Sequence, residues 1–564
     1  MNTKVLQLAV FTVVVSACAS ASARANRFIA GGHEFFGLSP EKLLQHAAEY
    51  DKLPIDGVIL SIETKGRYGN RISTWWSFND PAWDYDDLAP LESKYREVMR
   101  RRVFANSLLS FYPSPHVRVA WTNDVEWARI AHNMRMAARL AKRGGFKGLQ
   151  MDPEDYHAQR QYFLNEKDGI DFAAAKQFAR RRARQVFQGV FEEFPDAYIL
   201  SYWFLSMVHR YSYDIDGRLL PQRVERGGKD LWPSFIDGIF DALPPTAVLV
   251  DGDEEAYRYE ASRNQFIEAA CWCRSEFVWL LSPENRGKYR SQMQVSFGAY
   301  LDAYTFAQPG SWFYMGPRNG SRLGHLEENL RQAAKGADEM IWLWCEKGRW
   351  IGDKKNWESL LPGLHDTLLA VKDPAAYGRV LRHRREAGEL KALNANSACT
   401  GAGSAQLPEP YSSWQREGKR IRSGTFGCDT TIGDGDSCSL VASNVQHGCI
   451  LLSSKKIRPQ GCKSGERFGL SFSSKGRHVS AGVHWTAGGS NDFAIAKIAI
   501  PVSDEVDDAG WAHTDWSFVI PEGADGFVVT LSANLDAGEK CWYDNVAIVH
   551  DAPKVAVSGT GNGK

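Results

Sequence analysis

The 564-residue sequence predicts an α/β domain followed by an all-β domain, and three observations support this division. Apolar runs alternate with amphipathic helical stretches over residues 26–393. The segment 394–413, NANSACTGAGSAQLPEPYSS, is small, polar and rich in turn formers, which is typical of a linker. Beyond it, residues 414–553 contain short alternating runs broken by Gly, Asp, Asn and Pro, as in an antiparallel β-sandwich. Residues 554–564 are expected to form a frayed tail.

The first domain contains eight candidate strands, and helical stretches separate most of them. The strands are expected at residues 27–35, 56–63, 104–112, 146–154, 197–204, 246–253, 293–302 and 339–346. Eight repeated βα units predict a (β/α)8 TIM barrel. A doubly wound open sheet is the alternative, but no Gly-rich phosphate loop follows the first candidate strand.

The second domain is expected to be a jelly-roll sandwich held by disulfides. Its strand-like runs are residues 467–474, 479–485, 493–500, 516–520, 526–533 and 541–549. Six cysteines fall in this region or its linker: Cys399, Cys428, Cys438, Cys449, Cys462 and Cys541. Six cysteines in an exported module predict a disulfide framework, whose connectivity the sequence leaves open.

Residues 1–25 resemble a bacterial export signal. Lys4 precedes an apolar run from Val5 to Val15, and small residues follow. The run is too short to span a bilayer. The tetrapeptide VSAC, which ends at Cys18, matches a lipobox and predicts a lipid anchor, whereas simple cleavage after an A-x-A-like site would discard Cys18. Both alternatives predict export.

Composition excludes one class of partner. The chain has 67 basic and 67 acidic residues, so no basic field is present to hold nucleic acid. The chain also has 19 Trp, 20 Tyr and 28 Phe, which indicates large cores or faces on which flat ligands stack.

The stretch GFKGLQMDPEDYH, residues 145–157, begins as a buried strand and ends in carboxylates. Side chains alternate along a strand, so Gly148, Gln150, Asp152 and Glu154 are expected on one face, which points toward the barrel axis. Catalytic groups of such barrels lie at the carboxyl ends of the strands. The strand is therefore expected to be apolar where it packs and acidic at the barrel mouth.

Other strand ends repeat this arrangement. Acidic residues end four further candidate strands, at Glu63, Asp251 with Asp253, Asp302 and Glu346. His33 follows the first strand, and Trp203 and Trp344 stand near the ends of theirs. A single acidic strand end often only caps the next helix. Several on one rim repel one another, which costs stability unless a function offsets the cost.

Clustered carboxylates with aromatic residues favour glycoside hydrolysis, which needs one protonated and one ionised carboxyl group. Glu154 is the candidate acid, with Asp152, Glu346 and Asp251 as further candidate catalytic residues. The candidate substrate-binding residues are Trp203, Trp344, Tyr156, Asp302, His33 and Glu63. No metal ligand set and no cofactor are predicted.

The barrel resembles those of the glycoside hydrolases, many of which carry their acid at the end of the fourth strand. In KGLQMDPE, Asp152 and Glu154 match the last two acidic positions of the D-G-x-D-x-D-x-E strand of chitinase-type enzymes, while Lys147 and Gln150 replace the earlier aspartates and Pro153 replaces an aromatic residue. A second comparison is with hydrolases that have a nucleophile on strand four and an acid on strand six. That resemblance implies a pairing of Asp152 with Asp251.

The segment WSFVIPEGADGFVVTLSANLDAGEKCWYDNVAIVH is similar to the closing strands of carbohydrate-binding jelly rolls. The matching parts are residues 516–521, 527–531 and 543–546. This resemblance implies a polysaccharide or oligosaccharide partner. Three functions remain open: an exported glycoside hydrolase, a non-catalytic glycan-binding lipoprotein, and a metal-dependent hydrolase that uses Asp251 and Asp253.

Overall fold

The structure is a computed structural model. It describes residues 27–209, 220–226, 229–318, 321–352, 355–393, 411–413, 424–435, 438–444, 448–454, 464–487 and 497–551. The expected export signal with Cys18, most of the expected linker and the expected tail lie outside these residues. No helix in the described ranges is both long enough and apolar enough to cross a membrane. The contacts divide the chain into two compact units, 1–316 with 326–361, and 317–325 with 362–564.

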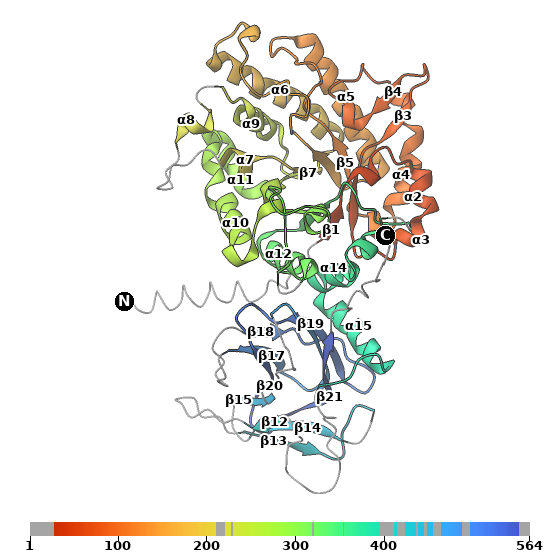
Figure 1. Cartoon of the computed structure of the whole chain (residues 1–564), viewed down its shortest axis with the longest axis vertical. Helices are drawn as coiled ribbons and strands as arrows, with labels where there is room; N and C mark the ends of the chain where they lie inside the picture. The colour runs from red at the N-terminus through yellow and green to blue at the C-terminus, as the bar shows by residue number, and fades with distance from the viewer. Residues whose placement is uncertain are drawn as a thin grey trace, which may run out of the picture. The chain divides into compact units, whose positions relative to one another are not determined.

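The first unit is built on a curled parallel sheet of nine strands surrounded by helices, which is the arrangement of an α/β barrel (Figure 1). The sheet order is β10-β11-β1-β2-β5-β6-β7-β8-β9, and every neighbouring pair is parallel. The strands are β1 (Arg27–Ala30), β2 (Gly57–Leu60), β5 (Leu108–Phe111), β6 (Gly148–Met151), β7 (Tyr198–Ser201), β8 (Val248–Asp251), β9 (Met293–Val295), β10 (Gly298–Tyr300) and β11 (Met340–Trp344).

The two edge strands, β9 and β10, belong to one chain segment. Only Ser296 and Phe297 separate them. The Ser296 N–H donates to the Asp251 carbonyl of β8 at 2.8 Å, and the Phe297 carbonyl accepts from the Trp342 N–H of β11 at 3.1 Å. The sheet therefore curls until its two edges meet at this segment. A strand lies within each of the eight predicted strand segments, and the seventh is split into β9 and β10.

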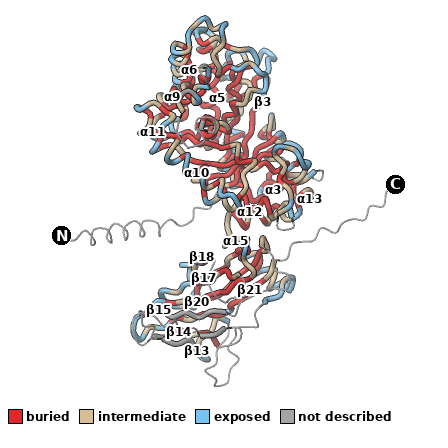
Figure 2. Tube along the Cα trace, turned by 60° about the vertical axis from the view of Figure 1, so that its left-hand side comes forward, coloured by how far each residue is buried: buried red, intermediate tan, exposed pale blue. Residues whose placement is uncertain are grey.

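Helices connect successive strands and pack against the sheet and one another. They include α2 (Pro40–Gln45), α4 (Pro90–Met99), α5 (Asp124–Gly144), α6 (Phe172–Glu193), α9 (Trp232–Ala242), α10 (Gln265–Ser275), α11 (Arg286–Gln292) and α12 (Arg322–Gly336). Local chemistry sets the ends of α5. The Asn123 side chain accepts from the Glu126 N–H, and Gly145 ends the helix at φ 82°, a conformation that favours glycine. The strands inside this ring are buried (Figure 2).

The second unit contains two antiparallel sheets of five strands, which is consistent with a sandwich. Their orders are β12-β15-β20-β17-β18 and β13-β14-β21-β16-β19. The strands are β12 (Tyr411–Ser413), β13 (Gly424–Asp429), β14 (Ser439–Asn444), β15 (Gly448–Ser454), β16 (Arg467–Lys475), β17 (Val479–Thr486), β18 (Lys497–Ile500), β19 (Ala512–Val519), β20 (Gly526–Leu535) and β21 (Lys540–Asp551). Leu440, Phe468 and Ile548 of one sheet share a core with Val483 and Phe527 of the other. This shared core holds the two sheets together.

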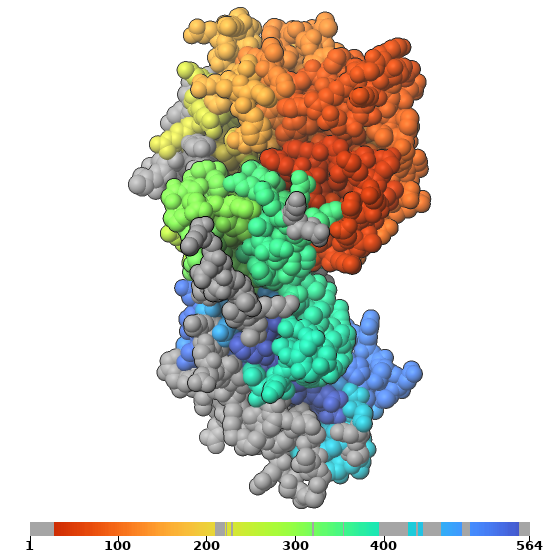
Figure 3. Space-filling view, turned by 45° about the vertical axis from the view of Figure 1, so that its right-hand side comes forward, coloured from red at the N-terminus to blue at the C-terminus, as the bar shows by residue number. Residues whose placement is uncertain are grey.

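Helices α14 (Leu364–Lys372) and α15 (Pro374–Glu386) belong to the second unit, although the sequence placed them with the barrel. Tyr377 and Leu381 of α15 share a small core with Val549 of β21. The space-filling view shows the green surface of this helical segment against the blue surface of the sandwich (Figure 3). The division of contacts thus falls earlier in the chain than the boundary expected at residue 393.

The cysteines differ from the expected framework. Cys438 and Cys541 are buried in the sandwich core, and neither forms a disulfide. The prediction that all six cysteines form disulfides is therefore wrong for Cys438 and Cys541. The side chains of Cys399, Cys449 and Cys462 lie outside the described residues, so a pairing that involves them stays a prediction.

Asp551 joins α15 to the sandwich, and its replacement is expected to destabilise the second unit. Its carboxylate accepts from Tyr377 Oη and Arg384 Nη1, each at 2.8 Å, and pairs with Arg467 at 3.4 Å. Asp551→Asn removes the anion that pairs with the buried Arg467, whereas Arg384 keeps its pairing with Glu389. We expect a loss of about 3 kcal/mol in the free energy of unfolding, measured by urea denaturation. The matched control Asp508→Asn alters an exposed aspartate and is expected to cost less than about 0.5 kcal/mol. Equal losses in the two variants would contradict this role of Asp551.

Candidate functional site

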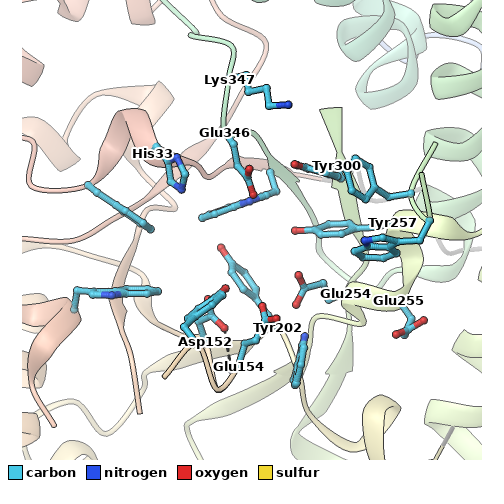
Figure 4. A pocket seen from close by; sticks show the side chains of 17 residues that line it. His33, Asp152, Glu154, Tyr202, Glu254, Glu255, Tyr257, Tyr300, Glu346 and Lys347 are labelled. Carbon is cyan, nitrogen blue, oxygen red and sulfur yellow. Dashed lines mark hydrogen bonds between the residues drawn. The ribbon is translucent and has the colours of Figure 1, made fainter. Parts of the chain in front are cut away.

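A cavity of about 600 Å³ lies at the carboxyl ends of the strands in the first unit (Figure 4). Its walls come from the ends of β10 and β11 and from the segments that follow β1, β2, β6, β7, β8, β10 and β11. The described residues that line it are His33, Phe36, Trp75, Asp152, Glu154, Tyr156, Tyr202, Trp203, Glu254, Glu255, Tyr257, Tyr300, Trp312, Phe313, Trp344, Glu346 and Lys347.

The structure brings seven of the ten predicted site residues to this cavity. These are His33, Asp152, Glu154, Tyr156, Trp203, Trp344 and Glu346. They come from strands far apart in the sequence, and the curled sheet gathers their carboxyl ends on one side. Their catalytic and binding roles stay predictions.

Asp152 follows β6 directly and is 2% exposed. Its Oδ1 accepts from the Glu154 N–H at 3.1 Å, and its Oδ2 accepts from Tyr156 Oη at 3.0 Å. Burial raises the pKa of Asp152 to about 7, with a further contribution from the charge of Glu154, while the two hydrogen bonds act in the opposite direction. Asp152 therefore fixes the loop that carries Glu154 and can hold a proton near neutral pH.

Glu154 and Glu346 come from opposite walls of the cavity (Figure 4). Burial raises the pKa of Glu154, and repulsion from the charge of Glu346 adds to this, against a hydrogen bond from Tyr156. Glu346 is exposed, and Asp302 holds its backbone: the Asp302 carboxylate accepts from the Glu346 N–H at 2.8 Å and the Lys347 N–H at 3.2 Å. The arrangement can keep one carboxyl group protonated beside an ionised one.

Glu254 is a site residue that sequence reasoning missed. It begins the short helix η6 (Glu254–Arg258), three residues after the end of β8. Burial raises the pKa of Glu254 well above its usual value, and the charges of Asp152, Glu154 and Glu346 raise it further. A hydrogen bond that the Trp203 side chain donates to Glu254 lowers this pKa. The run DGDEE, residues 251–255, was the available signal, but the sequence favoured its two aspartates.

Those two aspartates have structural partners instead. Asp251 is 1% exposed and accepts from the Ser206 N–H at 2.8 Å and the Ser206 hydroxyl at 2.6 Å, at the start of α7 (Leu205–His209). Burial raises its pKa to about 6. Asp253 is 4% exposed and accepts from Tyr259 Oη at 3.2 Å, and burial with repulsion from Asp251 raises its pKa to about 8. Neither is among the described residues that line the cavity.

Two predicted substrate-binding residues also lie outside the lining. Asp302 is 1% exposed, and its carboxylate accepts hydrogen bonds from the backbone N–H groups of Glu346 and Lys347. Glu63 lies on β3 (Glu63–Lys65), is exposed, and pairs with Arg71 of β4 (Arg71–Ser73) at 2.8 Å. The alternation of strand side chains alone does not distinguish such residues from those that face the cavity.

Aromatic rings form much of the cavity wall. Phe36 packs against Trp75 with ring centroids 5.0 Å apart, and His33 lies edge-on to Trp344. On the other side Tyr257 stacks on Tyr300 with centroids 5.1 Å apart. Such flat apolar faces can pack against the C–H faces of a sugar ring.

The acidic residues of the cavity do not form a close ligand set. In the described ranges, the one group of three ligand atoms within 4.8 Å of one another is Asp434, Asp507 and His513, which belongs to the second unit. The cavity thus offers separated carboxyl groups.

No protein-family model and no curated protein matches the chain. Among solved structures, a variant of the Thermobaculum terrenum O-GlcNAc hydrolase aligns with 63% of this chain and 61% of its own, at 10% identity and a TM-score of 0.32. The CBM22-2 xylan-binding domain of Paenibacillus barcinonensis Xyn10C aligns over 28% of this chain and 98% of its own, at 12% identity and a TM-score of 0.21. The enzymatically active domain of bacteriophage CBA120 tailspike protein 4 aligns at 19% identity and a TM-score of 0.22, over 28% of this chain and 21% of its own. These TM-scores are below 0.5 and carry no argument about function.

Proposed function

We propose that the chain is an exported glycoside hydrolase with a (β/α)8 barrel that cleaves a polysaccharide or an oligosaccharide. One observation carries the proposal: carboxyl groups from the ends of β6 and β11 face each other across a cavity with aromatic walls. Glycoside hydrolysis needs two such groups on either side of the scissile bond. The cavity volume, about 600 Å³, is within the range of small-molecule sites.

Glu154 is the general acid in this proposal. Its raised pKa, caused by burial and by the charge of Glu346, favours the protonated form that the role requires. The Glu154 proton passes to the glycosidic oxygen as the bond to the anomeric carbon breaks. Because Glu154 is only half-buried, water can restore its proton after each turnover.

Glu346 is the ionised partner, as nucleophile or as base for water. Asp302 holds the Glu346 and Lys347 N–H groups, which fixes the loop at the end of β11. Asp152 is a positioning residue, because its carboxylate binds the Glu154 N–H and the Tyr156 hydroxyl. Trp75, Trp344 and Tyr300 supply faces for sugar rings.

The remaining parts of the proposal concern the rest of the chain. The second unit is a carbohydrate-binding jelly roll, supported by its two antiparallel sheets with a shared core. Export, with or without a lipid anchor at Cys18, rests on the sequence of residues 1–25.

A screen of polysaccharides for released reducing ends tests this function. We expect at least one glycan to be cleaved, and Glu346→Gln to lower its turnover by about 10²-fold or more, because the variant removes the ionised partner. Glu255→Gln is the matched control, since Glu255 lines the same cavity but pairs with Arg258. Binding of glycans without any release of reducing ends would instead support a non-catalytic glycan-binding protein.

A further inference from the structure

One carboxyl group of the cavity has no part in the proposed chemistry. Glu154 and Glu346 serve as acid and partner, and Asp152 positions Glu154. Glu254 lies on the same cavity from the end of β8 (Figure 4). A further acidic side chain among three others costs stability unless something offsets its charge.

The surroundings of Glu254 are incomplete. Its Oε2 is shielded from solvent and has no hydrogen-bond partner. Tyr202, which lines the same cavity and is 3% exposed, has a hydroxyl group in the same condition. Buried polar atoms are normally paired, so two such atoms on one cavity indicate that a bound molecule completes their contacts.

Lys347 and His33 line the cavity, but no described cation forms a close ion pair with its four central carboxyl groups. None of Asp152, Glu154, Glu254 and Glu346 forms an ion pair with a described Lys, Arg or His within 4.0 Å. Lys347 Nζ lies 5.6 Å from the Phe306 ring centroid. Arg258 pairs with Glu255 and covers the Trp312 ring at 5.1 Å.

Carboxylates surrounded by aromatic faces are suited to an ammonium group. The carboxylate supplies a charge-assisted hydrogen bond, and the negative face of an aromatic ring attracts the cation. Tyr202 stacks on Trp342 with centroids 3.9 Å apart and meets Trp344 edge-on, and Tyr257 meets the same Trp342 at 5.3 Å. The rings are thus held rigidly around the segment from which Glu254 projects.

We propose that this cavity binds an amino sugar whose primary amine is protonated, with Glu254 as the partner of the ammonium group. The proposal rests on the proposed function and narrows it to glycans that contain de-N-acetylated hexosamine. Uronic-acid and sulfated glycans would bring a second negative charge to an acidic cavity and are expected to bind poorly.

Binding of the amine should release a proton. Burial and the carboxyl groups of Asp152, Glu154 and Glu346 raise the pKa of Glu254 well above its usual value. The phenols of Tyr156, Tyr202 and Tyr257 and the indole of Trp203 interact with it and carry no positive charge. Lys347 and His33 line the same cavity without an ion pair to Glu254. An ammonium group beside Glu254 lowers its pKa, so Glu254 gives up its proton to solvent.

A pair of small probes tests the ammonium site without assuming a sugar configuration. Tris is a primary ammonium with three hydroxymethyl groups, and pentaerythritol is its neutral analogue with four. We expect calorimetry at pH 7 to show that Tris, but not pentaerythritol, binds the wild-type protein. The heat of Tris binding should change with the ionisation enthalpy of the buffer, which indicates that a proton is released. Glu254→Gln should lose the preference for Tris, whereas Glu255→Gln should keep it.

Sugars then extend the test. Hexamers of glucosamine and galactosamine are compared with their N-acetylated forms, and we expect at least one amine form to bind about tenfold more tightly. Equal binding of Tris and pentaerythritol, or a Tris preference that survives in Glu254→Gln, would overturn the proposal. Hydrolysis of neutral glycans without an ammonium preference would leave the proposed function in place and remove only this inference. An ammonium preference without hydrolysis of any glycan would support the ammonium site and contradict the proposed hydrolase function.

Discussion

Glu154→Gln is expected to lower the turnover of a polysaccharide substrate by about 10²–10⁴-fold while substrate still binds. The substitution keeps the shape of the side chain and its place on the cavity wall but removes the proton that the leaving oxygen needs. Reducing-end release gives the rate, and calorimetry with the same glycan gives the affinity. A variant that keeps more than about half of wild-type turnover would contradict the role of Glu154, because such a loss is far below that expected of a positioned acid.

The leaving group separates an acid catalyst from a group that only shapes the cavity. An aryl glycoside with an acidic phenol departs without protonation, so Glu154→Gln should retain far more activity on it than on the polysaccharide. Glu346→Gln should lose activity on both substrates, because its role does not depend on the leaving group. Glu255→Gln should match the wild type on both. Equal losses by Glu154→Gln on the two substrates would mean that Glu154 does not donate the proton.

The barrel strands were predictable because each is a short apolar run with a helical stretch on either side. This local signal is strong in β6 and β11, which are buried along their whole length. The split of the seventh strand was not predictable, because it depends on hydrogen bonds from Ser296 to β8 and from Phe297 to β11. Sheet closure is a property of strands far apart in the sequence, and no single segment encodes it.

The helices at residues 364–386 also depend on contacts with residues far away along the chain. The boundary expected at residue 393 assigned them to the barrel, because composition does not say which core a helix joins. Tyr377 and Leu381 pack on Val549, and Arg382 pairs with Asp515 at 3.1 Å, all in the second unit. These partners are more than 130 residues away along the chain, as Arg382 and Asp515 are separated by 133 positions. Composition near residue 394 therefore suggested a boundary later than the one that the contacts give.

The backbone explains why Glu254, and neither Asp251 nor Asp253, lines the cavity after β8. Strand alternation places Asp251 and Asp253 on one face, and both would then point inward. Asp253 instead has φ 39° and ψ 69°, a left-handed conformation that ends the strand geometry and starts η6. Glu254, the next residue, then reaches the cavity. Asp152 and Glu154 both line the cavity, and no left-handed residue lies between β6 and them.

Glu254→Gln is expected to stabilise the protein at pH 8 and to have little effect on stability near pH 4. The folded-state pKa of Glu254 is raised well above its unfolded value, so folding favours the protonated carboxyl group. Below the unfolded pKa, about 4.3, both states are protonated and the group costs nothing extra. As the pH rises, the unfolded chain ionises freely while the folded chain must keep the proton or bury a charge. Stability is therefore lost progressively as the pH rises toward the folded-state pKa.

A glutamine at position 254 removes this loss, since it does not titrate. The gain in the free energy of unfolding should be larger at pH 8 than at pH 4, because at the higher pH only the folded glutamate must keep its proton or bury a charge. Melting temperatures of the wild type and the variant at pH 4, 6 and 8 measure it, and the difference between them should grow with pH. Glu255→Gln should show no such growth, because the cation of Arg258 offsets the charge of Glu255. If the difference in melting temperature is the same at all three pH values, the folded state does not raise the pKa of Glu254. Growth of the difference would show that the chain keeps a destabilising carboxyl group in its cavity, which is the expected cost of a group retained for a ligand.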